Sequence, residues 1–100
     1  MVRLLPIQAV MLRIRTIPNG LLATTLHLEG RIVSTWVSVL EDECTRLLQE
    51  PGRRLRLDLG AVLFVDDRGV LVLQWLTAQG IELTNIPPFI ETRLRGDRTS

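Results

Sequence analysis

The sequence predicts an α/β fold with the element order β-β-α-β-α-β-α, a four-stranded mixed sheet and the helices packed on one face. Three observations lead to this expectation. Two alternating apolar and polar segments are joined by Asn19-Gly20, a strong hairpin signal. Later segments switch to the helical period of apolar residues and enclose a further alternating strand. Because strand–helix–strand units require parallel pairing with right-handed crossovers, the hairpin makes the sheet mixed.

The first two strands are expected over residues 10–17 and 21–30. In the first, Leu12 and Ile14 alternate with Arg13 and Arg15, and in the second, leucines alternate with polar residues. Such alternation is typical of strands that bury one face and expose the other to water. The opening hairpin should therefore line the core with one face only.

The first helix is expected over residues 34–50, with Ser34 or Thr35 as its cap and Cys44 in its apolar stripe. Pro51-Gly52 ends it. The next strand runs to the aspartates at 66 and 67, and its first half alternates leucines with charged residues. This strand should also present one charged face.

The second helix is expected over residues 67–79. It is apolar almost all round, so we expect it to be well buried, with one of Trp75 and Leu76 near the surface. An exposed tryptophan there would mark a partner patch. A short strand at 81–86 and a last helix with Phe89, Ile90 and Leu94 inward complete the order.

Length and composition predict one domain. The chain has 100 residues, of which 46% are hydrophobic, and its formal net charge is +1. We expect the folded domain to span residues 10–96, with residues 1–9 as an arm or extra edge strand and 97–100 as a disordered tail. The near-zero charge argues against a nucleic-acid binder.

The basic residues exclude two kinds of chemistry. All 12 are arginine, so neither a phosphate-binding loop lysine nor a Schiff-base lysine is present. The lone Cys44 fits a reducing compartment. No convincing signal peptide and no apolar run of membrane-spanning length occur, so we expect a cytoplasmic protein without membrane insertion.

The junction Asp66-Asp67-Arg68-Gly69 between two apolar stretches is the main candidate site. Aspartates at a helix start can accept hydrogen bonds from free backbone N–H groups, so one of them could be only a helix cap. Gly69 in the first helical turn indicates that something approaches the backbone closely. Ligands and partners of open sheets dock at such strand ends.

Three segments around this junction resemble the STAS domain of bacterial anti-sigma factor antagonists. They are "LHLEGRI" (26–32), "LRLDLGAVLFVDDRGVLVLQWL" (55–76) and "GIELTNI" (80–86), and the resemblance covers about residues 10–95. Leu28-Glu29-Gly30-Arg31 matches the family's Leu-x-Gly-Arg segment, and the run ending at Asp66 matches its strand. The resemblance implies a non-enzymatic protein, without cofactor or metal, that regulates transcription by binding another protein.

The chain departs from the family at its phosphorylation site. The family's Ser or Thr after the conserved aspartate is replaced by Asp67, and Arg68 replaces a small residue. Asp67 could imitate the phosphorylated state imperfectly, because a carboxylate carries less charge than a phosphate. Alternatively the phospho-switch is lost, with Asp67 a cap and binding retained. Arg68 could also pair with a neighbouring acid.

Other charged residues give weaker candidates. Arg13, Arg15, Arg54 and Arg56 form an outward face that could bind an anion or an acidic partner, or could be a solvated face that discourages aggregation. His27 would need an ordered partner for acid–base work, and we identify none. Without a lysine, Asp58, Asp66 and Asp67 do not indicate phospho-acceptor or metal chemistry.

The leading hypothesis is a signalling protein that resembles an anti-sigma factor antagonist and offers Asp66–Gly69 to a kinase-like anti-sigma factor. The alternative is an accessory STAS subunit of a lipid-transport ABC system, which docks on the transporter's ATPase. Both are protein-binding functions without a nucleic-acid partner. The free edge of the hairpin could also pair in a homodimer.

Overall fold

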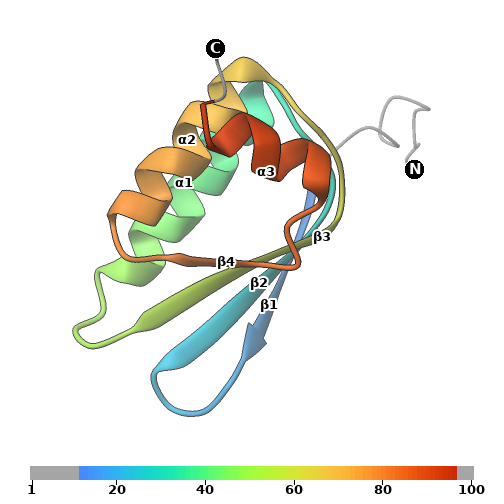
Figure 1. The fold of residues 1–100 in the computed structure, drawn as a ribbon. Coiled ribbons are helices and arrows are strands. Elements are labelled where there is room, and N and C mark those ends of the chain that lie inside the picture. The colour runs from blue at the N-terminus through green and yellow to red at the C-terminus, as the bar shows by residue number, and fades with distance from the viewer. Residues whose placement is uncertain (1–11, 97–100) are drawn as a thin grey trace, which may run out of the picture.

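The strands and helices follow one another in the expected order (Figure 1). The computed structural model describes residues 12–96, so the expectations for residues 1–9 and 97–100 lie outside the described residues. The strands are β1 (Leu12–Pro18), β2 (Ala23–Ile32), β3 (Arg54–Val65) and β4 (Glu82–Thr84). The helices are α1 (Thr35–Leu48), α2 (Asp67–Ala78) and α3 (Pro88–Leu94).

The sheet is mixed and has the strand order β1-β2-β3-β4. β1 pairs with β2 in antiparallel fashion, whereas β3 lies parallel to both β2 and β4. The predicted α/β fold class is therefore confirmed. The β4 strand is shorter than the predicted segment, since its pairing with β3 extends only from Glu82 to Thr84.

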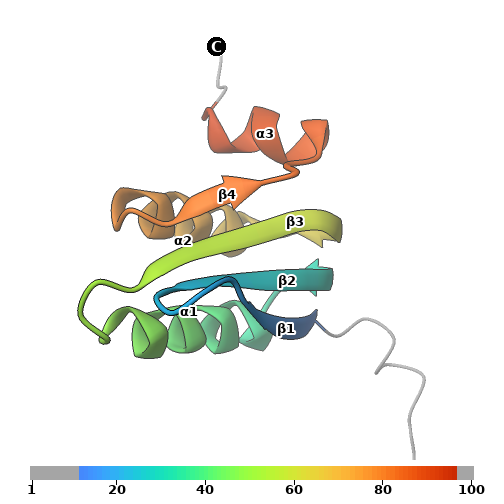
Figure 2. The same cartoon turned by 90° about the horizontal axis from the view of Figure 1, so that it is seen from below.

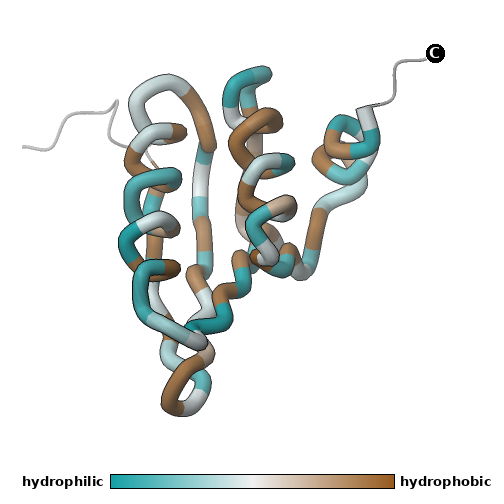
Figure 3. Tube along the Cα trace, turned by 90° about the vertical axis from the view of Figure 1, so that its left-hand side faces the viewer, coloured by the Kyte–Doolittle hydropathy of each residue, from teal (hydrophilic) through white to brown (hydrophobic). Residues whose placement is uncertain are grey.

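The helices form a layer on one side of the sheet. α1 and α2 lie against the sheet, and α3 continues the layer past β4 (Figure 2). Figure 3 shows the three helices side by side, with α2 in the middle. Leu26, Leu28, Leu57 and Leu59 fill the space between the two layers and are fully buried, as their inward positions in the alternation predict.

Two predictions about the helices are wrong. The α2 helix is not buried all round, because Leu71 is 64% exposed on the side turned away from the sheet. Phe89 of α3 was expected to point inward but is 45% exposed, whereas Ile90 is fully buried. α3 is a short helix at the rim of the layer, so only one narrow face meets the core.

An irregularity in the sheet lies close to the candidate junction. Gly30 of β2 pairs with Val62, and the next residue, Arg31, pairs with Phe64. Leu63 is thus an extra residue on β3 and projects from the strand with 75% exposure. Such a bulge locally increases the twist of a strand and redirects its end.

Candidate functional site

The candidate site lies where β3 ends and α2 begins, beside the end of β2. Ile32 and Val65 are the last paired residues of these two parallel strands, and Asp66 follows Val65 directly. The backbone N–H of Asp66 donates to the carbonyl oxygen of Ile32 at 3.1 Å, so the junction is anchored to β2.

Asp66 is the N-cap of α2. The sequence left open which of the two aspartates caps this helix, and the structure assigns the role to Asp66 and not to Asp67. Its Oδ1 accepts a hydrogen bond from the backbone N–H of Gly69 at 2.7 Å. Its Oδ2 accepts from the backbone N–H of Ser34 at 2.9 Å. One carboxylate therefore joins the starts of α1 and α2, and neither oxygen is left free of a protein partner.

Ser34 precedes α1 but does not cap it with its side chain, contrary to one of the sequence expectations. Ser34 has φ 51° and ψ −127°, a backbone conformation that residues other than glycine rarely adopt. Its side chain makes no capping hydrogen bond. This conformation places its N–H where it can donate to Asp66. The start of α1 is thus held by a carboxylate from the neighbouring helix.

The close approach predicted at Gly69 comes from the chain itself. A Cβ at this position would lie 2.7 Å from Cγ1 of Val65 and 2.8 Å from the carbonyl oxygen of Ile32. The glycine lets the first turn of α2 pack directly on the ends of β2 and β3. It is buried and does not offer its backbone to a ligand.

Asp67 and Arg68 have different partners from those that the sequence suggested. The side chain of Asp67 is 98% exposed and forms an ion pair with Arg93 of α3. Arg93 also donates to the carbonyl oxygen of Val65. Among residues 12–96, Arg68 pairs with no acid, and it donates to Oγ of Ser38 on α1 at 3.1 Å. The two charged residues therefore link α2 to the helices on either side.

Arg93 is a site residue that the sequence analysis missed. It lies 26 residues from Asp67, and no local pattern indicates that α3 would return to the junction. Between α2 and α3 lies a groove of about 490 Å³ with Asp67 and Arg93 in its wall. The remaining residues that line it are Val70, Leu71, Gln74, Thr92 and Gly96.

An exposed stripe on α2 begins at the junction. Arg68 is followed on the same helix face by Leu71 and Trp75, three and seven residues further on. Trp75 is 43% exposed and Leu76 is fully buried, which confirms that one residue of this pair lies at the surface. We call Asp67, Arg68, Leu71 and Trp75 the α2 surface.

The outward face of the sheet carries a network of opposite charges around His27. Nδ1 of His27 lies 3.1 Å from Oδ2 of Asp58, and Nε2 lies 3.3 Å from Oε2 of Glu29. Glu29 also pairs with Arg13 at 3.4 Å and Arg15 at 3.9 Å. The sequence analysis found no ordered partner for His27, and the structure corrects this because Asp58 of β3 and Glu29 of the same strand lie on either side of its ring.

Asp58 is the best-anchored acid of this face. Its Oδ1 accepts hydrogen bonds from the backbone N–H of Gly60 at 3.0 Å and from Nδ2 of Asn85 at 3.1 Å. The hydrogen bond from Gly60 is the main reason that the pKa of Asp58 is lowered, and those from Asn85 and His27 act in the same direction. The residue is therefore held as a carboxylate.

Arg54 and Arg56 lie at the start of β3 and differ from each other in their partners. Nε of Arg56 donates to Oε1 of Glu82 at 3.2 Å. Within residues 12–96, no ion pair joins Arg54 to a carboxylate. The four arginines proposed as one anion-binding face thus divide into three paired cations and one without an acidic partner.

Cys44 lies in the core, as its place in the helical stripe predicts. It is fully buried in α1, and burial raises the pKa of its thiol to about 12. Across residues 12–96, no group of three or more His, Cys, Asp or Glu side chains could hold a metal ion. In the same part of the chain, no helix combines the length and apolar character needed to cross a membrane.

Comparison with solved structures identifies the fold. No family model matches the chain, and no curated protein matches it. The unphosphorylated form of the anti-sigma factor antagonist SpoIIAA superposes with a TM-score of 0.67 and 14% identity, over 87% of this chain and 90% of that one. The chain has the STAS fold. The resemblance read from the sequence motifs is confirmed at this level.

The chain also resembles part of a larger protein. A structure of Mglu matches with a TM-score of 0.59 and 25% identity over 73% of this chain, and Mglu in its native form matches with a TM-score of 0.51 and 20% identity over 70%. The chain spans only about a fifth of the length of these Mglu chains, since it covers 20% and 22% of them.

Proposed function

We propose that the chain is a non-enzymatic regulatory protein that binds a protein partner through the α2 surface. The observation that carries the proposal is the exposure of Leu71 and Trp75 on one stripe of α2 that starts at the junction. Buried aromatic anchors surrounded by polar residues are typical of the centre of protein interfaces. Asp67 and Arg68 supply such a polar rim at the start of the helix.

We infer that the partner is an anti-sigma factor. This inference is supported by the STAS motifs, by the overall likeness to SpoIIAA and by the position of Asp67 directly after the cap Asp66. The pairing of Asp67 with Arg93 offsets the carboxylate charge, so we favour binding without a phospho-switch over imitation of phosphoserine. The protein would then bind its partner constitutively in a cytoplasmic, bacterial setting.

Partner capture followed by affinity measurements tests the proposal. The tagged full chain is cross-linked in cells of its source, and the captured protein is identified by mass spectrometry and purified. We expect Trp75→Ala to weaken binding about 30-fold or more, as for a central interface residue. Asp67→Arg should also weaken binding, because it reverses the sign of a charge at the rim. Leu63→Ser is the matched control, because Leu63 is also exposed but lies on β3.

The outcomes separate the two protein-binding hypotheses. A kinase-like anti-sigma factor whose binding falls with both α2 variants supports the proposal. Capture of a transporter ATPase would replace it with the accessory-subunit function. Equal loss with Leu63→Ser, or unchanged affinity of Asp67→Arg, would contradict the α2 surface as the binding site.

A second experiment addresses the phosphorylation site. In Asp67→Ser the hydroxyl required by a serine kinase is present, so a kinase-like partner should incorporate phosphate into this variant and not into the natural chain. Phosphate at residue 67 would indicate an ancestral switch removed by Asp67. Absence of incorporation with the captured partner would mean that this partner operates no phospho-switch at residue 67.

A further inference from the structure

A second surface lies at the opposite end of the sheet from the junction. The turn between β1 and β2 projects there, beyond the start of β3 (Figure 1). Leu21 in this turn is 94% exposed, Leu22 is 50% exposed and Ile17 is 38% exposed. We call these three residues the hairpin tip. An isolated exposed leucine needs no explanation, but three neighbouring apolar side chains on a protruding turn do.

The backbone of this turn is held by hydrogen bonds, so its apolar side chains are presented on a defined scaffold. The N–H of Asn19 donates to the carbonyl oxygen of Ala23 at 2.8 Å, and the side chains of Asn19 and Thr25 are also hydrogen-bonded. The N–H of Arg54 donates to the carbonyl oxygen of Leu22 at 2.7 Å. That last bond attaches the tip to the start of β3.

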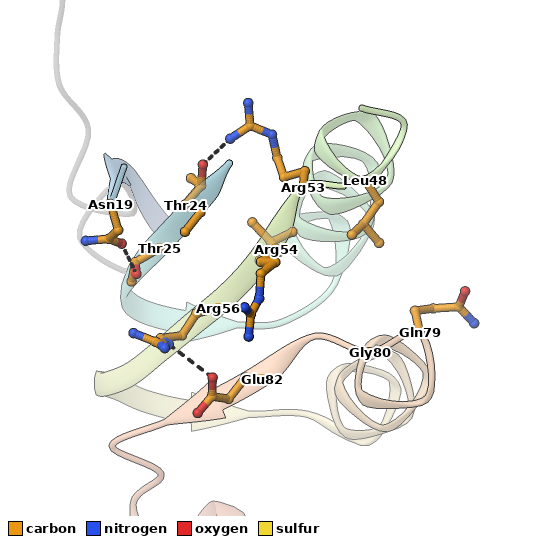
Figure 4. A pocket seen from close by; sticks show the side chains of 12 residues that line it. Asn19, Thr24, Thr25, Leu48, Arg53, Arg54, Arg56, Gln79, Gly80 and Glu82 are labelled. Atoms are coloured by element: carbon orange, nitrogen blue, oxygen red, sulfur yellow. Dashed lines mark hydrogen bonds and ion pairs between the residues drawn. The ribbon is translucent and has the colours of Figure 1, made fainter. Parts of the chain in front are cut away.

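An arginine-lined basin of about 400 Å³ lies beside the tip. Arg53, Arg54 and Arg56 line it, together with Thr24, Gln79 and Glu82 (Figure 4). Arg53 pairs with Glu50 and donates to Thr24, and Arg56 pairs with Glu82. Within residues 12–96 the guanidinium of Arg54 forms no hydrogen bond or ion pair, so the basin carries one uncompensated positive charge.

We propose that this end of the molecule docks on an anionic lipid surface, with the hairpin tip entering the interface and Arg54 binding a lipid phosphate. Apolar side chains that reach past a cationic site match a bilayer, in which hydrocarbon lies beneath the layer of phosphates. A guanidinium can donate two parallel hydrogen bonds to a phosphate. The contact is peripheral and leaves free the start of α2, where Asp67 and Arg68 lie at the other end of the sheet.

Co-sedimentation of the full chain with vesicles tests this docking. Vesicles of phosphatidylcholine are compared with vesicles that also contain phosphatidylglycerol, at low and high salt. We expect binding only to the anionic vesicles, and weaker binding at high salt. Arg54→Gln should reduce partitioning about fivefold. Leu21→Ser should reduce partitioning at least about tenfold, because the variant loses the burial of a leucine side chain in the apolar part of the membrane.

Two matched controls isolate the site. Leu63→Ser removes a leucine that is 75% exposed on β3 near the junction, and Arg13→Gln removes an exposed arginine of β1 that pairs with Glu29. Both variants should bind anionic vesicles like the natural chain. Circular dichroism of all four variants confirms that each is folded.

Three results would overturn the proposal. The first is absence of binding to anionic vesicles. The second is binding of inorganic phosphate that depends on Arg54 and competes with vesicles, together with unchanged vesicle binding of Leu21→Ser. The basin would then be a site for soluble anions. The third is loss of a captured protein complex in Leu21→Ser without any vesicle binding, which would make the tip a protein contact.

Discussion

Asp66 and Asp67 are neighbouring residues of the same type with opposite structural roles. Both oxygens of Asp66 accept backbone hydrogen bonds, from Gly69 and from Ser34. Asp67 points outward, with its side chain 98% exposed and paired with Arg93. The first carboxylate holds the junction together, whereas the second is available at the surface.

Alanine substitution of each aspartate tests this difference. Asp66→Ala leaves two backbone N–H groups without their acceptor and should lower the free energy of unfolding by about 1–3 kcal/mol. Asp67→Ala removes an exposed ion pair and should cost less than about 1 kcal/mol. Urea denaturation of both variants measures the two values. Equal costs would contradict the assignment of Asp66 as the structural residue.

Gly69 provides a second test at the residue scale. In an exposed helix, alanine would be more stable than glycine by about 0.5–1 kcal/mol. At this position the added Cβ would lie 2.8 Å from the carbonyl oxygen of Ile32, so Gly69→Ala should instead destabilise by about 1–3 kcal/mol.

Gly60→Ala is the control for this substitution. The nearest atoms to a Cβ at Gly60 are Cβ of Asn85 and Oδ1 of Asp58, each at 3.3 Å, so a smaller loss is expected. A gain in stability for Gly69→Ala in chemical denaturation would show that the ends of β2 and β3 are not tightly packed against α2.

The start of α1 shows how one element depends on another. Ser34 occupies the N-cap position, but its side chain makes no capping bond and its backbone has a positive φ of 51°. The sequence pattern correctly marked where the helix begins. It could not indicate that the bond at this position runs from the Ser34 backbone to Asp66 of the next helix start.

Two substitutions at Ser34 separate these contributions. Ser34→Ala should change the free energy of unfolding by less than about 0.5 kcal/mol, whereas loss of a true serine cap costs about 1 kcal/mol. Ser34→Gly should stabilise the fold by about 1 kcal/mol, because relief of backbone strain exceeds the added entropy of the unfolded chain. Thermal and urea unfolding measure both. A lower free energy of unfolding for Ser34→Gly would contradict backbone strain at Ser34.

The exposure of α2 is a property of its place in the helical layer. Its middle position gives it neighbours on both sides and the sheet beneath, which explains its many apolar residues. The remaining stripe has no neighbour within the described residues, so Leu71 and Trp75 lie at the surface. An almost uniformly apolar helix therefore indicates burial plus an exposed apolar stripe in this case.

At the scale of the whole molecule, charges from three strands meet on the open face of the sheet. Asp58 of β3 contacts His27 of β2, which also contacts Glu29, and Glu29 contacts the arginines of β1. Because the strands are paired in register, one network connects β1, β2 and β3. It pairs Arg13 and Arg15, two of the four arginines that the sequence suggested as an anion-binding face, and Arg56 pairs separately with Glu82 of β4.

The lowered pKa of Asp58 predicts a dependence of stability on pH. The folded-state pKa of Asp58 lies below the ordinary aspartate value of 3.8, so the ionised carboxylate stabilises the fold above that pH. This contribution declines as pH falls below about 3.8 towards the folded-state pKa. Asp58→Asn should therefore be less stable than the natural chain at about pH 7, and the difference should shrink at about pH 3.

Urea unfolding at both pH values measures this difference. Asp42→Asn serves as the control, because it makes the same change of side chain at an exposed position of α1. If the difference in the free energy of unfolding between Asp58→Asn and the natural chain is the same at both pH values, protonation of Asp58 is not coupled to folding.

The sequence by itself determined the element order, the inward leucines of the strands, the buried Cys44 and the helix start at Asp66. These features depend on local periodicity and on capping by residues that are near in the chain. The STAS motifs pointed to the same fold, which the superposition on SpoIIAA supports. Local patterns suffice because each of these residues needs only its own strand or helix to define its environment.

Only the tertiary structure decided which partners the site residues have. Arg93 reaches Asp67 across 26 residues, and Arg68 reaches Ser38 across 30. The carbonyl oxygen of Ile32 that crowds Gly69 and the carboxylate of Asp58 beside His27 also come from neighbouring strands, and the alternation within one strand does not indicate its neighbours. Such contacts depend on sheet order, register and helix packing, and these are set by burial of the whole core rather than by any single segment.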